Sequence, residues 1–177
     1  MRFSTVYDVL IHAANTWPDH IAVYDEHGAI SFRQLWEETE SLRQVLVQKG
    51  IKAGMGIGVK AQNSRNFIIG LFAAVGTGAT VMPMAHQLKK AEIDDMLKEA
   101  GLHAILDDGS GALPFAEPAE EIKMQVGAFY FGFTHIDPVT SFAAHVQSPA
   151  FMRFTSGTTG KSKGVLISHQ SVIERIE

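Results

Sequence analysis

The sequence contains no cysteine among its 177 residues. This absence excludes disulfide bonds, a thiolate nucleophile, iron–sulfur clusters and zinc sites built from cysteine ligands. Proteins of reducing compartments do without disulfides, so the composition fits a cytoplasmic protein.

Charge is sparse, and neither sign dominates. The chain carries 15 Lys+Arg and 19 Asp+Glu, a formal net charge of -4 with its eight histidines neutral. This mild acidity argues against a general nucleic-acid-binding protein, because such proteins use a basic surface to displace counterions from phosphates. Hydrophobic residues make up 46% and charged residues 19% of the chain, which is typical of a folded globular domain.

The sequence shows neither an export signal nor a membrane span. Asp8 interrupts the apolar run that an N-terminal secretory signal needs. Residues 66–88 are rich in apolar side chains and include no Asp, Glu, Lys or Arg. A helix that spans a membrane needs about 20 consecutive apolar residues, so the length of this segment would be sufficient. Gly76, Gly78 and Pro83 would break that helix, so we expect a buried helix followed by a short strand.

Local start and stop signals predict the first elements. Thr5 can cap a helix that ends before Pro18, and Ser31 with Gln34 forms a capping box for a second helix. Gly50 is placed to end this second helix. Between the two helices, residues 21–24 and 29–32 flank the turn sequence Asp-Glu-His-Gly and are typical of a β-hairpin.

Strand-like and helix-like segments then alternate. We expect strands at 56–61, 81–84 and 103–106, separated by helices that begin at Ser64 and Lys89. This alternation predicts an α/β fold, with a largely parallel sheet flanked by helices.

Beyond this region the signals weaken. Prolines and glycines are scattered over 107–149, and the aromatic residues at 129–133 form one extended patch. We expect a loop-rich connection here.

The most informative segment is 151–164. An apolar, strand-like stretch ends in ten residues, 155–164, that are all Gly, Ser, Thr or Lys. The glycines let backbone N–H groups converge, the hydroxyls can donate hydrogen bonds, and Lys161 and Lys163 add positive charge. A flexible surface turn is the alternative for any short glycine-rich match. The length of the run, the preceding strand and the two lysines favour binding of a polyphosphate.

Two phosphate-loop patterns compete for this segment. Gly160, Lys161 and Ser162 supply the end of a Walker A motif, but Thr155 stands where the motif needs its first glycine. A Walker loop also opens directly into a helix, whereas 164–168 is more typical of a strand. The Walker pattern is therefore only a near match.

The other pattern fits much better. Residues 155–164 (Thr-Ser-Gly-Thr-Thr-Gly-Lys-Ser-Lys-Gly), followed by Val-Leu-Ile-Ser and His169, resemble the signature loop of the adenylate-forming superfamily. This superfamily includes acyl- and aryl-CoA synthetases, luciferases and the adenylation domains of peptide synthetases. The family usually has proline where this chain has Ser162. The resemblance covers most of the chain, strongly at 151–169 and weakly between 107 and 149.

The resemblance implies a ligase that activates a carboxylic acid in two steps. The carboxylate attacks the α-phosphorus of ATP to give an acyl-adenylate and pyrophosphate, and a thiol then takes the acyl group. Preorganised donors and a lysine would stabilise the charge that builds on the departing pyrophosphate. By analogy with the family, this role falls to Thr155, Ser156, Gly157, Thr158, Thr159, Gly160 and Lys161, with Lys163 next in rank.

Within the superfamily we expect an acyl-CoA synthetase of fatty acid metabolism, which would use ATP, Mg²⁺ and CoA or another thiol acceptor. One alternative is the adenylation domain of a peptide synthetase-type system. The other is a nucleotide-binding or interaction module without ligase activity, which could self-associate through an exposed surface.

Family members carry further functional parts beyond the signature loop, including the acyl and adenine pockets, a magnesium-binding glutamate and a mobile C-terminal domain. We therefore expect residues 1–177 to be the N-terminal part of an AMP-binding domain. Its catalytic residues and metal ligands would lie elsewhere, and it would be inactive alone.

A few other polar residues invite a functional interpretation. The eight histidines include no pair at the spacing of metal ligands on a helix, so we expect no metal site. His169 would lie near the substrate in the family, but an ordinary histidine at a strand end explains it equally well. The acidic residues Glu37, Glu38 and Glu40 are expected on a solvated helix face. Arg153 interrupts an apolar strand and could pair with an acid.

Overall fold

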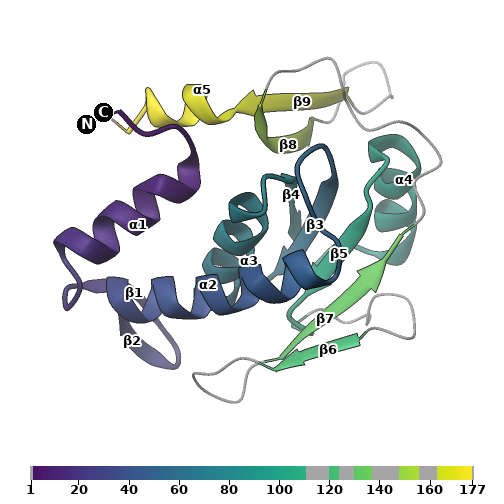
Figure 1. Ribbon diagram of the computed structural model, residues 1–177. Helices are drawn as coiled ribbons and strands as arrows, with labels where there is room; N and C mark the ends of the chain where they lie inside the picture. Colours follow the sequence, from purple (N-terminus) through teal and green to yellow (C-terminus); the bar gives the residue numbers. More distant parts are fainter. Residues whose placement is uncertain (1, 111–119, 124–129, 137–147, 156–162, 177) are drawn as a thin grey trace.

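The computed structural model describes residues 2–110, 120–123, 130–136, 148–155 and 163–176 (Figure 1). Its elements are, in chain order, α1 (Val6–Thr16), β1 (Ile21–Asp25), β2 (Gly28–Ser31), α2 (Phe32–Gln48), β3 (Gly56–Ala61), α3 (Arg65–Gly76), β4 (Thr80–Ala85), α4 (Lys90–Ala100), β5 (Ala104–Asp107), β6 (Glu120–Lys123), β7 (Tyr130–His135), β8 (Pro149–Thr155), β9 (Lys163–Ser168) and α5 (His169–Ile173).

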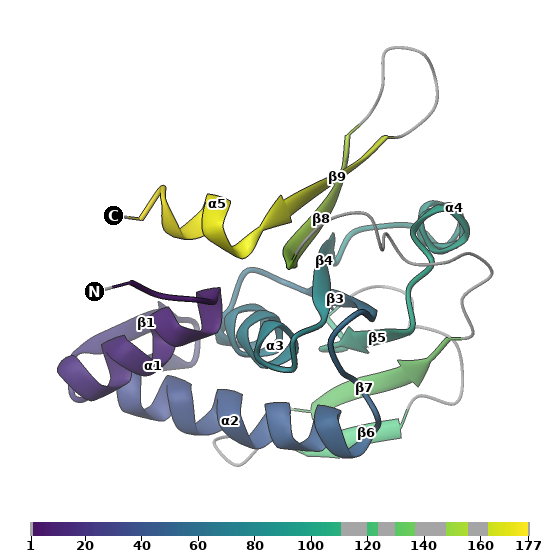
Figure 2. The same ribbon diagram turned by 45° about the horizontal axis from the view of Figure 1, so that its top comes forward.

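A seven-stranded sheet of order β6-β7-β5-β3-β4-β8-β9 forms the centre of the molecule. Strand β3 pairs in parallel with β4 and β5, and β4 pairs in parallel with β8. Strands β6, β7 and β9 are antiparallel to their neighbours. Helices α2 and α3 lie on one side of the sheet and α4 on the other (Figure 2). The predicted α/β architecture with a largely parallel centre is confirmed.

The predicted loop-rich stretch 107–149 contains two strands, β6 and β7. They continue the sheet beyond β5, where Leu106 pairs with Phe133 in antiparallel register. The sequence of β6, Glu-Glu-Ile-Lys, has only one strong strand-forming residue. Pairing with β7 rather than local propensity therefore determines this strand.

The predicted helix starts are confirmed. Thr5 caps α1 in a capping box with Asp8, and Ser31 caps α2 in a capping box with Gln34. The Ser64 side chain accepts a hydrogen bond from the backbone N–H of Asn66 at the start of α3. These signals act over four residues or fewer, which is why they can be read from sequence alone.

The two faces of the sheet carry separate hydrophobic cores. The larger core joins α1, α2 and α3 to the sheet through residues such as Leu42, Leu46 and Val59. The smaller core packs α4 against the opposite face and includes Met82 and Met84. Within the described residues, no helix is both long and apolar enough to cross a membrane.

The acidic residues of α2 do not all face solvent, which corrects the sequence-based expectation. Glu37 is exposed, but Glu38 is 4% exposed and buried. Glu40 accepts hydrogen bonds from Arg43 and from the hydroxyl of Tyr7. The bonds from Arg43 are the main cause that lowers the pKa of Glu40 to about 2. Helix α2 packs against both α1 and α3, so more of its surface is covered than one apolar stripe predicts.

Candidate functional site

The signature segment joins the two strands of an antiparallel hairpin. Strands β8 and β9 pair from Pro149 with Ser168 to Thr155 with Lys163. Strand β8 runs parallel to β4, with Val81 opposite Phe151. Counting along the strands puts Thr155 level with Ala85, the last residue of β4. The hairpin therefore ends at the carboxyl edge of the parallel strands, where open α/β sheets bind ligands.

The predicted phosphate-binding residues lie largely outside the described part of the structure. Thr155 and Lys163 are described by their backbone, as the last residue of β8 and the first of β9. Their side chains are outside the described residues, as are Ser156, Gly157, Thr158, Thr159, Gly160 and Lys161. The segment after the loop is a strand, as predicted, which separates it from a Walker loop that leads into a helix.

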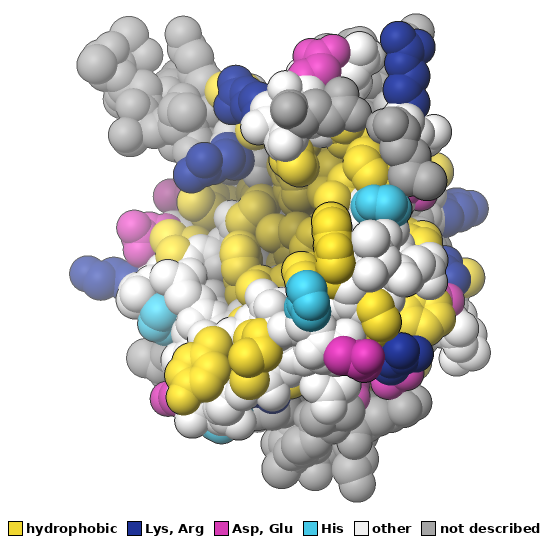
Figure 3. Space-filling view, turned by 90° about the vertical axis from the view of Figure 1, so that its left-hand side faces the viewer, with side chains coloured by type: hydrophobic (Ala, Val, Ile, Leu, Met, Phe, Trp, Pro, Cys, Tyr) yellow, Lys and Arg dark blue, Asp and Glu magenta, His cyan; other side chains and the backbone are white. Residues whose placement is uncertain are grey.

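A pocket of about 670 Å³ lies beside the hairpin, and we call it the carboxyl-end pocket. Its lining includes Ala61 and Ala85, which pair at the carboxyl ends of β3 and β4. Apolar side chains from α3, β4, β8, β9 and α5 line it: Phe67, Leu71, Pro83, Phe151, Ile167 and Val172. Its polar lining residues are Asn63, His86, Gln87 and Arg153. A hollow with hydrophobic side chains in its walls is visible in Figure 3.

Hydrogen bonds hold the backbone at this end of the sheet. Lys60 of β3 and Asp107 of β5 form an ion pair, with 2.8 Å between Nζ and Oδ2 and side-chain exposures of 1% and 7%. The backbone N–H of Gln62 donates to Oδ2 of Asp108 over 3.3 Å. The ends of β3 and β5 are thereby joined beside the pocket.

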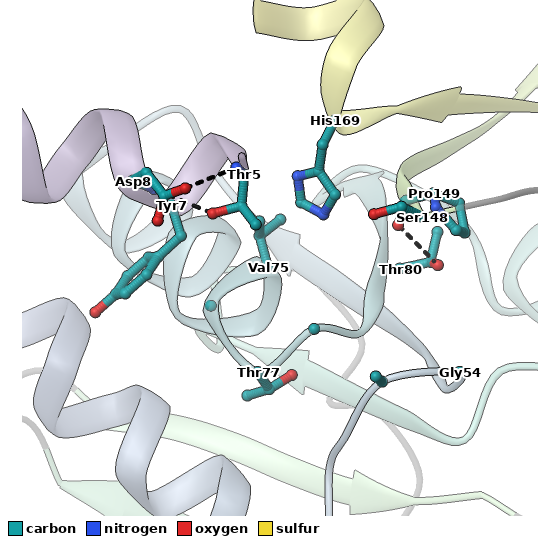
Figure 4. A pocket seen from close by; sticks show the side chains of 13 residues that line it. Thr5, Tyr7, Asp8, Gly54, Val75, Thr77, Thr80, Ser148, Pro149 and His169 are labelled. Atoms are coloured by element: carbon teal, nitrogen blue, oxygen red, sulfur yellow. Dashed lines mark hydrogen bonds between the residues drawn. The ribbon is translucent and has the colours of Figure 1, made fainter. Parts of the chain in front are cut away.

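A second pocket, of about 700 Å³, lies at the opposite end of the same strands, and we call it the amino-end pocket (Figure 4). It is lined by residues of α1, by the turn between α3 and β4, and by Ser148, Pro149 and His169. The His169 ring points from the start of α5 into this pocket (Figure 4). Its Nδ1 accepts a hydrogen bond of 3.0 Å from the backbone N–H of Val6.

His169 is therefore not on the side of the predicted phosphate loop. It follows β9 directly, and Ser168 is five residues from Lys163, which corresponds to about 17 Å of strand. Burial lowers the pKa of His169, and Asp8 opposes this effect by raising it. The hydrogen bond from Val6 connects the start of α1 to the end of the hairpin through His169. Of the two interpretations of His169, the structure favours an ordinary histidine at a strand end over a residue near the substrate.

The sequence did not single out Phe151, Asn63 and His86 as site residues, although all three line the carboxyl-end pocket. Each stands within a strand or just beyond its carboxyl end. That position is the only signal that could have identified them, and it becomes specific only once the order of the strands is known.

The described part of the chain contains no cluster of side chains that could bind Mg²⁺. Among these residues, no three histidine or acidic side chains lie close enough together to share a metal ion.

Comparison with known proteins adds to this geometry. A family model described as "AMP-binding enzyme" matches residues 10–177. Gramicidin S synthase 2 of Brevibacillus brevis is 29% identical over 164 residues, which cover 88% of this chain and 3% of the relative. Bacitracin synthase 2 of Bacillus licheniformis is 29% identical over 161 residues, which cover 88% of this chain and 6% of the relative. The chain thus spans a small part of the length of these relatives.

Solved structures share the fold. The N-terminal subdomain of Klebsiella oxytoca NpsA, in complex with 3-hydroxyanthranilyl-AMSN, superposes with a TM-score of 0.70 at 24% identity, over 95% of this chain and 41% of that one. The Bacillus subtilis O-succinylbenzoate coenzyme A synthetase MenE, in complex with AMP, gives a TM-score of 0.67 at 21% identity, over 93% and 42%. The family match extends over nearly the whole chain and includes the hairpin with its signature segment. This chain belongs to the AMP-binding enzyme family, whose members are adenylate-forming enzymes.

Proposed function

We propose that this chain is the N-terminal portion of an ATP-dependent, carboxylate-activating ligase, and that residues 155–163 hold the phosphates of ATP. The observation that carries the proposal is the β8–β9 hairpin, which brings the two ends of the signature segment to the carboxyl edge of the sheet. The neighbouring carboxyl-end pocket supports it, because ligands of open α/β sheets bind at this edge.

In the proposed reaction, a carboxylate oxygen attacks the α-phosphorus of ATP, and the bond between the α-phosphorus and the bridging oxygen breaks. The electron pair leaves with pyrophosphate, so negative charge accumulates at the signature segment. Backbone N–H groups, the hydroxyls of Thr155, Ser156, Thr158 and Thr159, and the ammonium of Lys161 stabilise that charge electrostatically. Lys163 adds a second positive charge where the loop returns to β9.

For the second step, we infer that the thiol that accepts the acyl group belongs to a carrier protein rather than to CoA. The relatives include synthases of gramicidin S and bacitracin, and a structural neighbour is an NRPS protein containing adenylation and PCP domains. These similarities support a peptide synthetase-type adenylation domain more strongly than the acyl-CoA synthetase of fatty acid metabolism that the sequence first indicated. The similarity to a coenzyme A synthetase keeps CoA as the second candidate.

The proposal is tested by titrating the purified chain with pyrophosphate in a calorimeter. Lys161→Ala should weaken pyrophosphate binding about tenfold, because a charge-assisted contact is lost. Lys52→Ala is the matched control, since it removes one exposed lysine outside the hairpin. Equal affinities of the native chain and Lys161→Ala would contradict the role of the loop.

Residues 1–177 alone are not expected to form acyl-adenylates. The superposed enzymes are less than half covered by this chain, and the remainder of such a protein would complete the active site. Carboxylate-dependent exchange of pyrophosphate into ATP by the purified chain would refute this expectation.

A further inference from the structure

One donor nitrogen of the amino-end pocket has no partner within the described chain. His169 is 5% exposed, and its Nδ1 accepts a hydrogen bond from the backbone N–H of Val6, so the proton of the neutral ring lies on Nε2. Burial lowers the pKa of His169, which favours the neutral ring at neutral pH. The Nε2–H group donates to no other described residue. Because the ring is directed into the pocket (Figure 4), it presents a buried donor to this space.

Most of the other polar side chains that line this pocket are already engaged within the chain. The hydroxyl of Thr77 donates to the carbonyl of Ala74 over 2.7 Å, and the hydroxyl of Thr80 donates to the carbonyl of Pro149 over 3.2 Å. Oδ2 of Asp8 accepts hydrogen bonds from two backbone N–H groups at the start of α1. The Nε2–H of His169 is therefore the buried donor that remains for a ligand.

The charges around the pocket define the ligand that this donor suits. Asp8 is the only Asp, Glu, Lys or Arg in the described lining, and the carboxyl-terminal end of α3, which carries a partial negative charge, also borders the pocket. An anion is therefore disfavoured. A cation whose polar groups all donate offers no acceptor to the Nε2–H group. An uncharged ligand with a carbonyl oxygen meets both conditions, and the volume of about 700 Å³ is large enough for a small ring.

We propose that the amino-end pocket is a second ligand site, which binds an uncharged carboxamide whose carbonyl oxygen accepts a hydrogen bond from Nε2 of His169. The amide suits the site because its oxygen is a neutral acceptor and brings no negative charge toward Asp8. Val75 and Pro149 offer apolar contacts to the rest of the ligand. The site lies at the opposite end of the strands from the proposed phosphate site, and the inference does not depend on the proposed function.

Three probes of nearly the same shape test the preference for an uncharged amide: benzamide, benzoate and the benzamidinium cation. Calorimetric titration of the chain at about pH 7.5 should give benzamide an affinity about tenfold higher than that of either ion. NMR of the chain with ¹⁵N-labelled histidine locates the site. Benzamide should shift the Nε2 signal of His169 in a saturable manner and leave the signals of His86, which lines the carboxyl-end pocket, unchanged.

Two substitutions separate the roles of the two ring nitrogens of His169. In His169→Asn, the side-chain oxygen replaces Nδ1 as the acceptor for Val6 but no donor replaces Nε2, so benzamide affinity should fall about tenfold while the melting temperature stays close to that of the native chain. In His169→Gln, the amide nitrogen can replace Nε2, so benzamide should bind more tightly than to His169→Asn although Val6 loses its acceptor. A merely structural role predicts the reverse order. The matched control is His20→Asn, which changes an exposed histidine and should leave benzamide binding unchanged.

Substitution of Asp8 tests the exclusion of anions. Asp8→Asn keeps an oxygen acceptor at the start of α1 and removes the negative charge. Benzoate affinity should therefore rise about fivefold, whereas benzamide affinity should stay the same. Asp95→Asn removes an exposed charge of α4 and serves as the control.

Several outcomes would overturn the proposal. If benzamide shifts the signals of His86 and not those of His169, it binds in the carboxyl-end pocket and the amino-end site does not exist. The proposal also fails if benzamide does not bind, if benzoate or benzamidinium binds as tightly as benzamide, or if His169→Asn with an intact fold binds benzamide as the native chain does. Thermal melting of each variant verifies that the fold is intact.

Discussion

The two pockets lie at opposite ends of the same strands and differ in what their polar groups bind. In the amino-end pocket, polar groups bond to each other: His169 accepts from Val6, Asp8 accepts from the N–H groups at the start of α1, and Thr80 donates to the carbonyl of Pro149. The carboxyl-end pocket has a mainly apolar lining, and its exposed Arg153 makes no hydrogen bond or ion pair with another described residue. The polar groups of the amino-end pocket therefore connect segments of the chain, whereas phosphate binding is proposed at the carboxyl end.

The comparison of the two ends also distinguishes charged side chains that stabilise the fold from those that are free to bind a ligand. Both ends contain ionisable side chains, but a polar atom already paired within the chain is not available to bind a ligand. The buried Lys60–Asp107 pair joins β3 and β5 at the carboxyl end, and the proposed phosphate binding falls to the signature segment.

The largest expected effect comes from breaking that pair. Lys60→Met should destabilise the protein by about 3–5 kcal/mol, because it leaves the Asp107 carboxylate buried without its partner. The double variant Lys60→Met/Asp107→Leu should recover most of this loss, because no charge then remains unpaired. Urea unfolding gives both free energies. The control is Lys90→Met, whose ion pair with Asp94 is exposed and should contribute no more than about 1 kcal/mol. If Lys60→Met lowered the free energy of unfolding no more than Lys90→Met does, the Lys60–Asp107 pair would not be needed to stabilise this end of the sheet.

An intermediate effect is expected at the amino end. His169→Ala should cost about 1–3 kcal/mol in the free energy of unfolding, because the N–H of Val6 loses its buried acceptor. Pyrophosphate binding should stay unchanged, because it is assigned to the other end of the strands. The matched control is His20→Ala, which removes an exposed histidine. A loss of pyrophosphate affinity in His169→Ala with an intact fold would erase the distinction between the two ends.

The smallest expected effect is a pH dependence of the same contact. Burial lowers the pKa of His169 in the folded protein, whereas the unfolded chain should titrate near the ordinary value of about 6.5. The contribution of His169 to stability is thus fully present above pH ~6.5, and it is lost as the pH falls toward the folded pKa. The stability difference between the native protein and His169→Asn should therefore narrow as the pH is lowered from about 7.5 through about 6.5, as measured by urea unfolding. If the stability difference between the two proteins widened as the pH fell, the pKa of His169 would be raised rather than lowered in the folded protein.

Local signals account for the part of the fold that was predicted correctly. Ser31 and Gln34 specify the start of α2 within four residues, and the alternation of strands and helices from β3 to β5 predicts parallel pairing. Strand β6 was missed, because its four residues form a strand only through pairing with β7. Glu38 was misplaced, because the packing of α2 against both α1 and α3 is not encoded in its own periodicity.

By itself, the sequence determined the helix caps, the α/β class and the concentration of glycines, hydroxyls and lysines in 155–164, because each depends on neighbouring residues. The places of Arg153 and His169 were decided only by the tertiary structure. Both belong to the β8–β9 hairpin and its immediate continuation, and the chain does not reveal which end of the sheet each one faces. Pairing of β8 with β4 puts Arg153 beside the carboxyl-end pocket, and the packing of α1 puts Val6 against His169. Contacts between segments far apart in the sequence therefore assign the two residues to opposite ends of the sheet.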